Sequence, residues 1–549
     1  MSKYSLGIDF GTLSGRAVLV DIANGNEIAT DVLEYRHAVM DEILCDGKTK
    51  LPLQTALQNP ADYIEVLKTV VPNVIKNSGV NPEDIIGVGV DFTASTVMPI
   101  DKAGEPLCFD EKFASNPHAY VKLWKHHSAQ YEADKFTKIA QESGEDFLKY
   151  YGGKMSSEWL FPKVMQILDE DEEVYNAADR FIEAGDWIVL KLTGEEKRSL
   201  CQAGYKAAWN KKTGYPSKEF LKKLNPGLEN VVEEKLNNNV YRTTECAGYI
   251  TKEAANLTGL KEGTAVAVAN IDAHVALPAA GVTKPGKLLM IMGTSTCHIM
   301  VSETESFIEG VSGVVEDGII PGYYAYEAGQ ACVGDHFEWF VKNAVPYSYY
   351  IEAEKENKNI YTLLEEKAKK LKPGESGLVA LDWFNGNRML SDADLSGVIL
   401  GYSLRTKPEE IYRALIEATA FGTKLIIDTF EEGGVQIDEL IAAGGLPQKN
   451  DMLMQIYADV TNRPIKISKS KQSCAVGAAI FGAVAAGKEK GGYDSIDEAS
   501  ENIAQYLEKF YTPIKENVEI YNKLFKEYKE LHEYFGKGEN NVMKRLRRL

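Results

Sequence analysis

The chain has 549 residues, of which 44% are hydrophobic and 26% are charged, and its formal net charge is −19. This length exceeds what one hydrophobic core usually supports, so two domains are expected. The acidic balance opposes non-specific binding to nucleic acid or to an anionic membrane surface, since both attract basic proteins. No apolar run reaches the length needed to cross a bilayer. The composition is that of a large globular protein with no nucleic-acid or membrane partner.

The cysteines are odd in number, widely scattered and without a Cys-x-x-Cys pair; they are Cys45, Cys108, Cys201, Cys246, Cys297, Cys332 and Cys474. This pattern indicates free thiols in a reducing compartment. No charged and then apolar leader precedes the first predicted strand. We therefore expect a cytoplasmic protein.

The first elements form a strand, a Gly-Thr turn and a second strand, predicted over 6–10 and 15–21. A helix follows near 60–77. The next strand, 85–91, is short, β-branched and punctuated by glycine, and it ends in Phe92-Thr-Ala-Ser95. Ligands of open α/β sheets bind at the carboxyl ends of such strands. We interpret the cluster of acidic residues at 169–173 as part of the solvated face of one helix over 164–178.

The middle of the chain marks the predicted lobe boundary. An apolar strand over 265–271 runs into a small-residue helix that ends at Gly281. Thr283-Lys-Pro-Gly286 then carries turn chemistry. We expect an N-terminal lobe over 1–283 and a C-terminal lobe over 287–549.

The second half repeats features of the first. Leu289–Met292 leads into Gly293-Thr294, and a second strand follows. A further strand over 440–443 runs into Gly444-Gly445, with a helix expected near Asn450. Another Ala/Gly-rich helix is predicted over 473–487, and a closing helix over 511–534. Paired features at similar offsets indicate an internal repeat.

The two Gly-Thr turns have the composition of a phosphate site. Gly11 and Gly293 can adopt backbone angles closed to other residues and let a ligand approach the main chain. Successive N–H groups of such a turn form an anion site. The hydroxyls of Thr12, Ser14, Thr294 and Ser295 add donors. Each turn alone also fits an ordinary hairpin, so the prediction depends on their pairing.

Other nucleotide-binding and metal-binding motifs are incomplete in this sequence. Gly47-Lys48-Thr49 resembles the end of a Walker loop, but Glu42 stands where its first glycine should be. Gly87-Val-Gly89 begins a dinucleotide fingerprint, but Phe92 replaces the third glycine. The histidines lack partners at zinc-ligand spacing.

The three turns at Asp9-Phe10-Gly11-Thr12, Gly293-Thr294 and Ala443-Gly444-Gly445 resemble the phosphate-1, phosphate-2 and adenosine motifs of the FGGY carbohydrate kinases. This family belongs to the actin, sugar-kinase and heat-shock-protein superfamily, and the resemblance covers nearly the whole chain. It implies an α/β fold of two actin-like, ribonuclease H-like lobes with a cleft for ATP and sugar between them. Phrases such as Gly89-Val-Asp-Phe-Thr-Ala-Ser-Thr96 and Asn270-Ile-Asp-Ala-His274 are similar to the branch that phosphorylates L-ribulose.

The resemblance implies that Asp272 is the catalytic base. Taken by itself, a carboxylate between a strand and a helix is more typical of an N-cap, and both roles can coexist. Asp9 is the corresponding candidate on the first turn. Taken by itself it also fits a turn-forming Asp, but we expect it to hold Mg²⁺, directly or through water, because an uncompensated carboxylate would repel polyphosphate. The sugar contacts that the resemblance implies are Ala94, Lys206, Asp272 and Glu327. The ATP contacts are Gly11, Thr12, Arg16, Gly293, Thr294, Gly444, Gly445 and Asn450.

The implied reaction is ATP-dependent phosphorylation of L-ribulose at its 5-hydroxyl, a step of L-arabinose catabolism. The cofactors would be ATP and Mg²⁺, and dimers are common in the family. Two alternatives stay open from the sequence. One is a kinase of the same family that acts on D-ribulose or xylulose. The other is an actin- or chaperone-like ATPase, against which the chain offers no separate β-rich peptide-binding domain.

Overall fold

The computed structural model describes residues 2–390, 392–538 and 540–547, which divide into two compact α/β units. The first unit comprises the chain up to Thr283 together with Gly313–Ala325 and Gln472–Gln505. The second comprises Lys284–Ser312, Tyr326–Lys471 and the chain from Tyr506. The α/β class is as predicted. The predicted lobes are continuous segments, whereas each compact unit is assembled from three segments of the chain.

The main sheet of the first unit runs in the order β11-β12-β5-β1-β2-β3. Its strands are β1 (Tyr4–Phe10), β2 (Ser14–Asp21), β3 (Asn26–Glu34), β5 (Ile85–Phe92), β11 (Cys246–Tyr249) and β12 (Ala265–Ala267). The short strand β13 (Asn270–Ile271) also pairs with β5, so the strand predicted over 265–271 is two strands. β1 is antiparallel to β2 and parallel to β5.

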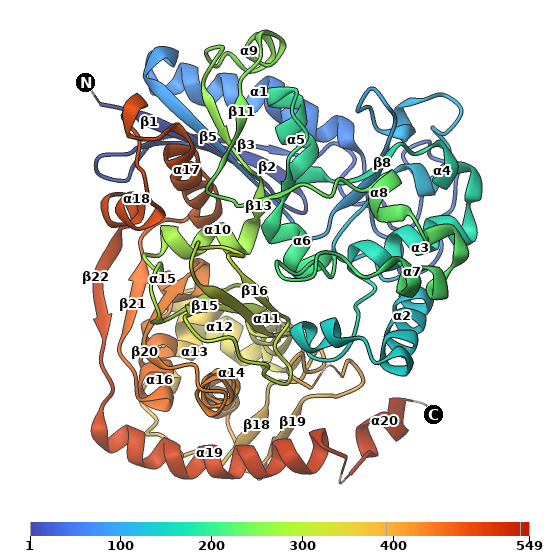
Figure 1. The fold of residues 1–549 in the computed structure, drawn as a ribbon. Helices are drawn as coiled ribbons and strands as arrows, with labels where there is room; N and C mark the ends of the chain where they lie inside the picture. The colour runs from blue at the N-terminus through green and yellow to red at the C-terminus, as the bar shows by residue number, and fades with distance from the viewer. Residues whose placement is uncertain (1, 391, 539, 548–549) are drawn as a thin grey trace. The chain divides into compact units, whose positions relative to one another are not determined.

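Helices cover both faces of this sheet. α1 (Pro60–Ser78) packs on β2 and β3, and α17 (Ser473–Ala486) packs on β1 and β5 (Figure 1). α10 (Asp272–Ala279) lies against α17. A Cβ atom on Gly7 of β1 would lie 1.7 Å from the carbonyl oxygen of Ala475. The corresponding distance from Gly89 of β5 to Ala478 is 1.8 Å. Only glycine at these positions lets the helix backbone lie on the strands.

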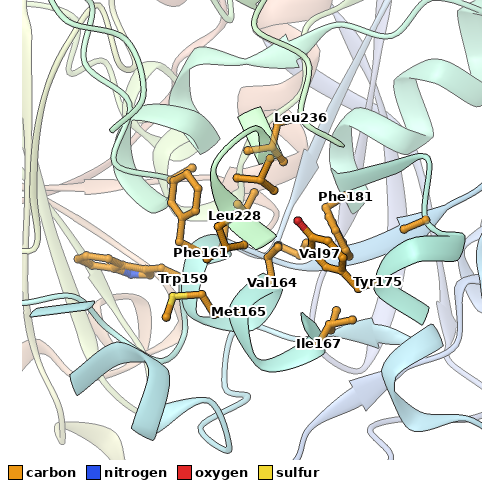
Figure 2. Packing of buried hydrophobic residues seen from close by; sticks show 14 of the residues in the cluster. Val97, Trp159, Phe161, Val164, Met165, Ile167, Tyr175, Phe181, Leu228 and Leu236 are labelled. Atoms are coloured by element: carbon orange, nitrogen blue, oxygen red, sulfur yellow. The ribbon is translucent and has the colours of Figure 1, made fainter. Parts of the chain in front are cut away.

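A second core of the first unit surrounds α3 (Leu160–Glu170). Figure 2 shows Phe161, Val164 and Met165 of this helix among other buried apolar side chains. A small sheet of order β4-β7-β6-β8 borders it, formed by β4 (Leu57–Gln58), β6 (Val97–Ile100), β7 (Val121–Lys122) and β8 (Arg180–Glu183). The helix predicted over 164–178 is two helices. Asp171 separates them and accepts a hydrogen bond from Val174 N at 3.0 Å, which begins α4 (Glu172–Ala177).

The sheet of the second unit includes the order β17-β15-β14-β20-β21-β22. Its strands are β14 (Gly286–Met292), β15 (Thr296–Ser302), β17 (Tyr324–Gln330), β20 (Ile437–Ala443), β21 (Ile465–Ser468) and β22 (Tyr506–Tyr511). β14 is antiparallel to β15 and parallel to β20. The trio β15-β14-β20 therefore repeats the topology of β2-β1-β5, as the paired Gly-Thr turns predicted.

Long helices support the second sheet: α14 (Pro408–Glu432), α16 (Asp451–Thr461) and α19 (Lys515–Gly536). α14 and α19 share a buried polar cluster, in which Arg413 donates to Glu417 at 2.7 Å and to the Tyr521 hydroxyl at 2.7 Å. The predicted closing helix begins later than expected because β22 occupies 506–511. Among the described residues, no helix is both long and apolar enough to span a membrane.

Gly89→Ala should destabilise the first unit by about 3 kcal/mol or prevent its folding, because the new methyl group meets backbone that cannot move aside. Calorimetric unfolding of the variant checks this expectation. Gly293→Ala is the matched control, since the Cβ there meets nothing closer than 4.0 Å. Equal transition temperatures for the two variants would contradict the packing described.

Candidate active site

The turn between β1 and β2 is held by backbone and side-chain bonds within the first unit. Gly11 N donates to Ser14 O at 3.0 Å. Thr12 O accepts from Gln58 Nε2 at 2.7 Å, and Thr12 Oγ1 accepts from Trp124 Nε1 at 3.0 Å. A hydroxyl that accepts a hydrogen bond still carries its own proton as a donor. The turn thus presents a fixed backbone and an oriented hydroxyl.

The turn between β14 and β15 is closed in a similar way in the second unit. Gly293 N donates to Ser295 O at 2.9 Å. The carbonyl oxygens of Gly293 and Thr294 accept from Gly334 N at 3.0 Å and Val333 N at 2.8 Å. These hydrogen bonds hold the carbonyl groups of the turn, and the Thr294 side chain is exposed.

One of the two reasons expected for glycine at these turns, an unusual backbone conformation, is wrong. Neither Gly11 nor Gly293 has a positive φ. A Cβ on Gly293 would meet its nearest atom at 4.0 Å, and one on Gly11 would meet Ser14 O at 3.3 Å. The glycines therefore keep space open above the turns and do not supply an unusual backbone conformation.

Gly444 does have an unusual backbone conformation. It directly follows β20 with φ 103° and ψ −177°, a region that essentially only glycine adopts. A Cβ there would lie 2.4 Å from Met292 O. Since β14 and β20 are parallel, with Ile291 opposite Ala443, the turns that follow them share one edge of the sheet. Gly445 is exposed, and a Cβ on it would meet no atom within 4 Å.

The helix expected near Asn450 is preceded by a short one, α15 (Gly445–Lys449). Asn450 is the N-cap of α16, and its Oδ1 accepts from Leu453 N at 2.8 Å. The Asn450 oxygen therefore has a structural role in starting this helix.

Two carboxylates lie side by side at the carboxyl ends of β1 and β5. Asp9 and Asp91 are opposite each other in the parallel ladder, and Asn270 of β13 is opposite Asp91 on its other side. Asp91 is fully buried, and its carboxyl group interacts with that of Asp9 through a side-chain hydrogen bond. Two buried carboxyl groups in contact are costly unless a proton or a cation compensates their charge.

The electrostatics of the pair agree with this placement. Burial, followed by the charges of Asp9 and Asp272, raises the pKa of Asp91 well above its ordinary value. Burial also raises the pKa of Asp9, while the Arg16 guanidinium opposes the rise. The charge of Asp272 thus acts on the same buried site.

Just beyond these carboxylates, the next residues of both strands form an aromatic anchor. Phe10 and Phe92 stack with ring centroids 5.0 Å apart, and Tyr63 of α1 meets Phe92 edge-on at 4.9 Å. The anchor holds the ends of β1 and β5 in a fixed register.

Arg16 is positioned by three neighbours in the first unit. Its Nε lies 3.4 Å from Asp9 Oδ2, Nη2 donates to Ser14 Oγ at 3.0 Å, and Nη1 donates to Gln472 Oε1 at 3.2 Å. The cation is therefore fixed beside the first turn and Asp9, which is consistent with a role in neutralising bound anions.

Asp272 is the first residue of α10, directly after β13. The expected N-cap role is wrong, because Ile271 occupies the cap position and makes no side-chain cap bond. Asp272 Oδ1 accepts from Ala273 N at 2.7 Å, and the residue is partly exposed. A helix N-terminus favours a charged carboxylate at this position.

The residues expected to bind sugar fall in both units. Ala94 follows β5 and is partly exposed. Lys206 ends α6 (Leu200–Lys206), is only 7% exposed and lies 5.9 Å from the ring centroid of Trp159. Lys206 is therefore a buried lysine, which is unusual for this residue type. Glu327 lies on β17 in the second unit and is partly exposed.

The structure thus brings Asp9, Arg16 and Asp272 to one end of the first sheet. In the second unit it brings Gly293-Thr294 and Gly444-Gly445 to one edge. Sequence reasoning missed Asp91, although its position at the end of a buried strand parallel to β1 was the available signal. Within the described ranges, no group of three or more His, Cys, Asp or Glu side chains forms a preformed metal site.

Comparison with known proteins assigns both halves of the chain to one family. Residues 4–278 match the N-terminal domain, and residues 288–486 the C-terminal domain, of the FGGY family of carbohydrate kinases. Ribulokinase of Bacillus licheniformis is 58% identical over 98% of this chain and 97% of its own length. Ribulokinase of Staphylococcus aureus is 42% identical over 100% of this chain and 99% of its own.

Solved structures share the fold. Xylulose kinase from Rhodospirillum rubrum matches with a TM-score of 0.78 at 22% identity, covering 96% of this chain and 98% of its own. Gluconate kinase from Lactobacillus acidophilus matches with a TM-score of 0.80 at 17% identity, covering 98% of this chain and 99% of its own.

Gly444→Ala should disturb the turn after β20 and lower the stability of the second unit by about 1–3 kcal/mol, because alanine must adopt a glycine-only conformation against Met292 O. Gly445→Ala is the neighbouring control, since it has open space. Thermal unfolding of both variants measures the difference. A Gly444→Ala protein as stable as the control would exclude the turn geometry.

Proposed function

Because the chain belongs to the FGGY family of carbohydrate kinases, we propose that it transfers the γ-phosphoryl group of ATP to the 5-hydroxyl of L-ribulose. The observation that carries the choice of sugar is the 58% identity to ribulokinases over nearly the whole chain. The product would be L-ribulose 5-phosphate, in the catabolism of L-arabinose. A cytoplasmic location and a homodimeric assembly stay predictions.

Phosphoryl transfer needs positioning, charge neutralisation and an acceptor for the alcohol proton. In this proposal Asp272 accepts the proton of the sugar hydroxyl as the hydroxyl attacks the γ-phosphorus. Its bond to Ala273 N fixes the carboxylate, and the start of α10 stabilises its charged form. The Asp272 carboxylate is thereby held ready as a base.

The phosphates would bind to the two Gly-Thr turns. Thr12 on one unit and Thr294 on the other would offer backbone and hydroxyl donors. The N–H groups of Gly11 and Gly293 close the turns, and these glycines leave space for the ligand because they lack a Cβ. Arg16 adds positive charge beside the first turn. The glycine-only turn at Gly444 and the open space at Gly445, followed by Asn450, would border the adenosine.

The residues at the first turn fit a divalent cation. Asp91 is a fully buried carboxyl group, and Asp9 is its neighbour in the ladder. Magnesium favours a few carboxylates together with water and substrate phosphates, so the lack of a preformed cage is compatible with it. Bound Mg²⁺ would neutralise charge on the polyphosphate. Asp9, as the more accessible of the two, would hold it directly or through water.

For the sugar, Lys206 would donate to its oxygen atoms and Glu327 would accept from its hydroxyls. Ala94 is small enough to leave room for an extended ketopentose. The burial of Lys206 supports this role, because an ammonium group removed from water interacts strongly with a polar ligand.

Asp272→Asn should lower kcat with L-ribulose by about 10²–10⁴-fold, the usual contribution of a general base, while ATP still binds. The assay is ADP release with MgATP and L-ribulose, D-ribulose, L-xylulose, D-xylulose or glycerol. Asp134→Asn, on an exposed helix position, is the control.

The sugar panel separates the alternatives. A higher kcat/KM for another ketopentose would change the substrate but keep the family reaction. ATP hydrolysis that no sugar stimulates, in the wild type and in Asp272→Asn alike, would contradict the kinase proposal.

Asp9→Asn and Asp91→Asn should each weaken binding of Mn²⁺ to the protein–ADP complex at least tenfold, because each removes a carboxylate from the proposed cation site. Metal-free ADP should bind as tightly as before, or more tightly, since a negative charge is lost. Electron paramagnetic resonance of Mn²⁺ and calorimetric titration of ADP measure the two quantities. Unchanged Mn²⁺ affinity in both variants would exclude these carboxylates as its ligands.

A further inference from the structure

The turn between β5 and β6 has an unusual backbone at the residue after Ala94. Ser95 has φ 47°, in the left-handed region that a residue with a Cβ rarely adopts. Thr93, Ser95 and Thr96 are buried, whereas Ala94 is partly exposed. The turn therefore presents Ala94 to a ligand, and something must hold Ser95 in its unfavourable conformation.

Two buried side chains from distant helices bind the peptide groups of Ser95. Lys163 of α3 donates from Nζ to Ser95 O at 2.5 Å and to Leu123 O at 2.9 Å. Gln202 of α6 accepts from Ser95 N at 3.1 Å through Oε1. Both side chains are fully buried. The left-handed turn is thus fixed at its N–H and at its C=O.

The same side chains connect the turn to the proposed sugar-binding lysine. Gln202 lies four residues before Lys206, so the two project from one face of α6. Glu183, at the end of β8, interacts electrostatically with both Lys163 and Lys206. Glu183 is buried, and it interacts with the backbone of Thr96, the residue that follows Ser95. The turn, Lys163, Glu183 and Lys206 therefore belong to one buried polar cluster.

We propose that Lys163 and Gln202 are positioning residues for sugar binding, which hold Ser95 in the left-handed conformation and so fix Ala94 against the ketopentose. Neither side chain touches the sugar in this proposal. Their effect passes through the backbone of the turn. The inference rests on the proposed function, because Ala94 and Lys206 are sugar contacts only there.

The first test is Gln202→Met, which keeps side-chain length and removes the acceptor for Ser95 N. We expect the KM for L-ribulose to rise about tenfold, while the KM for ATP stays within twofold of wild type. Gln141→Met, at an exposed position of α2 (Gln130–Ser143), is the matched control. Lys163→Met should also raise the KM for L-ribulose, because it removes the donor to Ser95 O.

A rescue experiment separates positioning from general damage. Glycine adopts a positive φ without the cost that serine has, so Ser95→Gly lessens the need for the clamp. In Gln202→Met/Ser95→Gly, compared with Ser95→Gly alone, the additional rise in sugar KM should fall from about tenfold to about threefold or less. A loss of packing around α6 would not be repaired by this change.

The outcomes are distinguishable. An unchanged sugar KM in a folded Gln202→Met protein would overturn the inference alone. Equal rises in both KM values with a lowered unfolding temperature and no rescue would also overturn it, because the role would then be purely structural. Wild-type protein without ketopentose-dependent turnover would overturn the proposed function and the inference together.

Discussion

The close contact between α17 and the strands β1 and β5 is the constraint on which the first unit depends. Glycines on the strands meet backbone atoms of the helix at separations where no Cβ fits. Gly477 of α17 likewise faces Val275 O of α10, where a Cβ would lie at 1.9 Å. The sheet, α17 and α10 are therefore locked together through backbone contact. This locking fixes the carboxyl ends of β1, β5 and β13, and with them Asp9, Asp91 and Asp272.

The same end of the sheet concentrates three carboxyl groups, and the protein compensates their charge only in part. Arg16 is the cation beside Asp9, and burial favours the neutral form of Asp91. A site of this kind is unfavourable when empty and becomes favourable when a cation or a proton enters it. The register of the two parallel strands places the carboxyl groups that, in the proposed function, would meet the metal-bound polyphosphate.

Local patterns predicted much of this architecture. Both Gly-Thr hairpins, the buried strand at 85–92 and the small-residue helix α17 follow from hydrophobic periodicity and turn residues. What the patterns missed depends on contacts between distant segments. Periodicity predicts one helix over 164–178, but Asp171 separates two helices there. Asp272 is the first residue of α10, and the N-cap position belongs to Ile271. Lys163 and Gln202 gave no signal, because their role arises only when α3 and α6 meet the turn at Ser95. The cation site, the base and the sugar contacts stay predictions that derive from family resemblance.

The segment Gln472–Gln505 belongs to the first unit although it follows most of the second unit in sequence. During synthesis, the strands β1 and β5 are made early, but the helix that covers their glycine-lined face emerges only after some 470 residues. The first unit therefore cannot complete its native core until most of the second has been translated. Until then the face of β1 and β5 that α17 covers lacks its native partner, and transiently exposed apolar surface of this kind makes folding intermediates prone to aggregation.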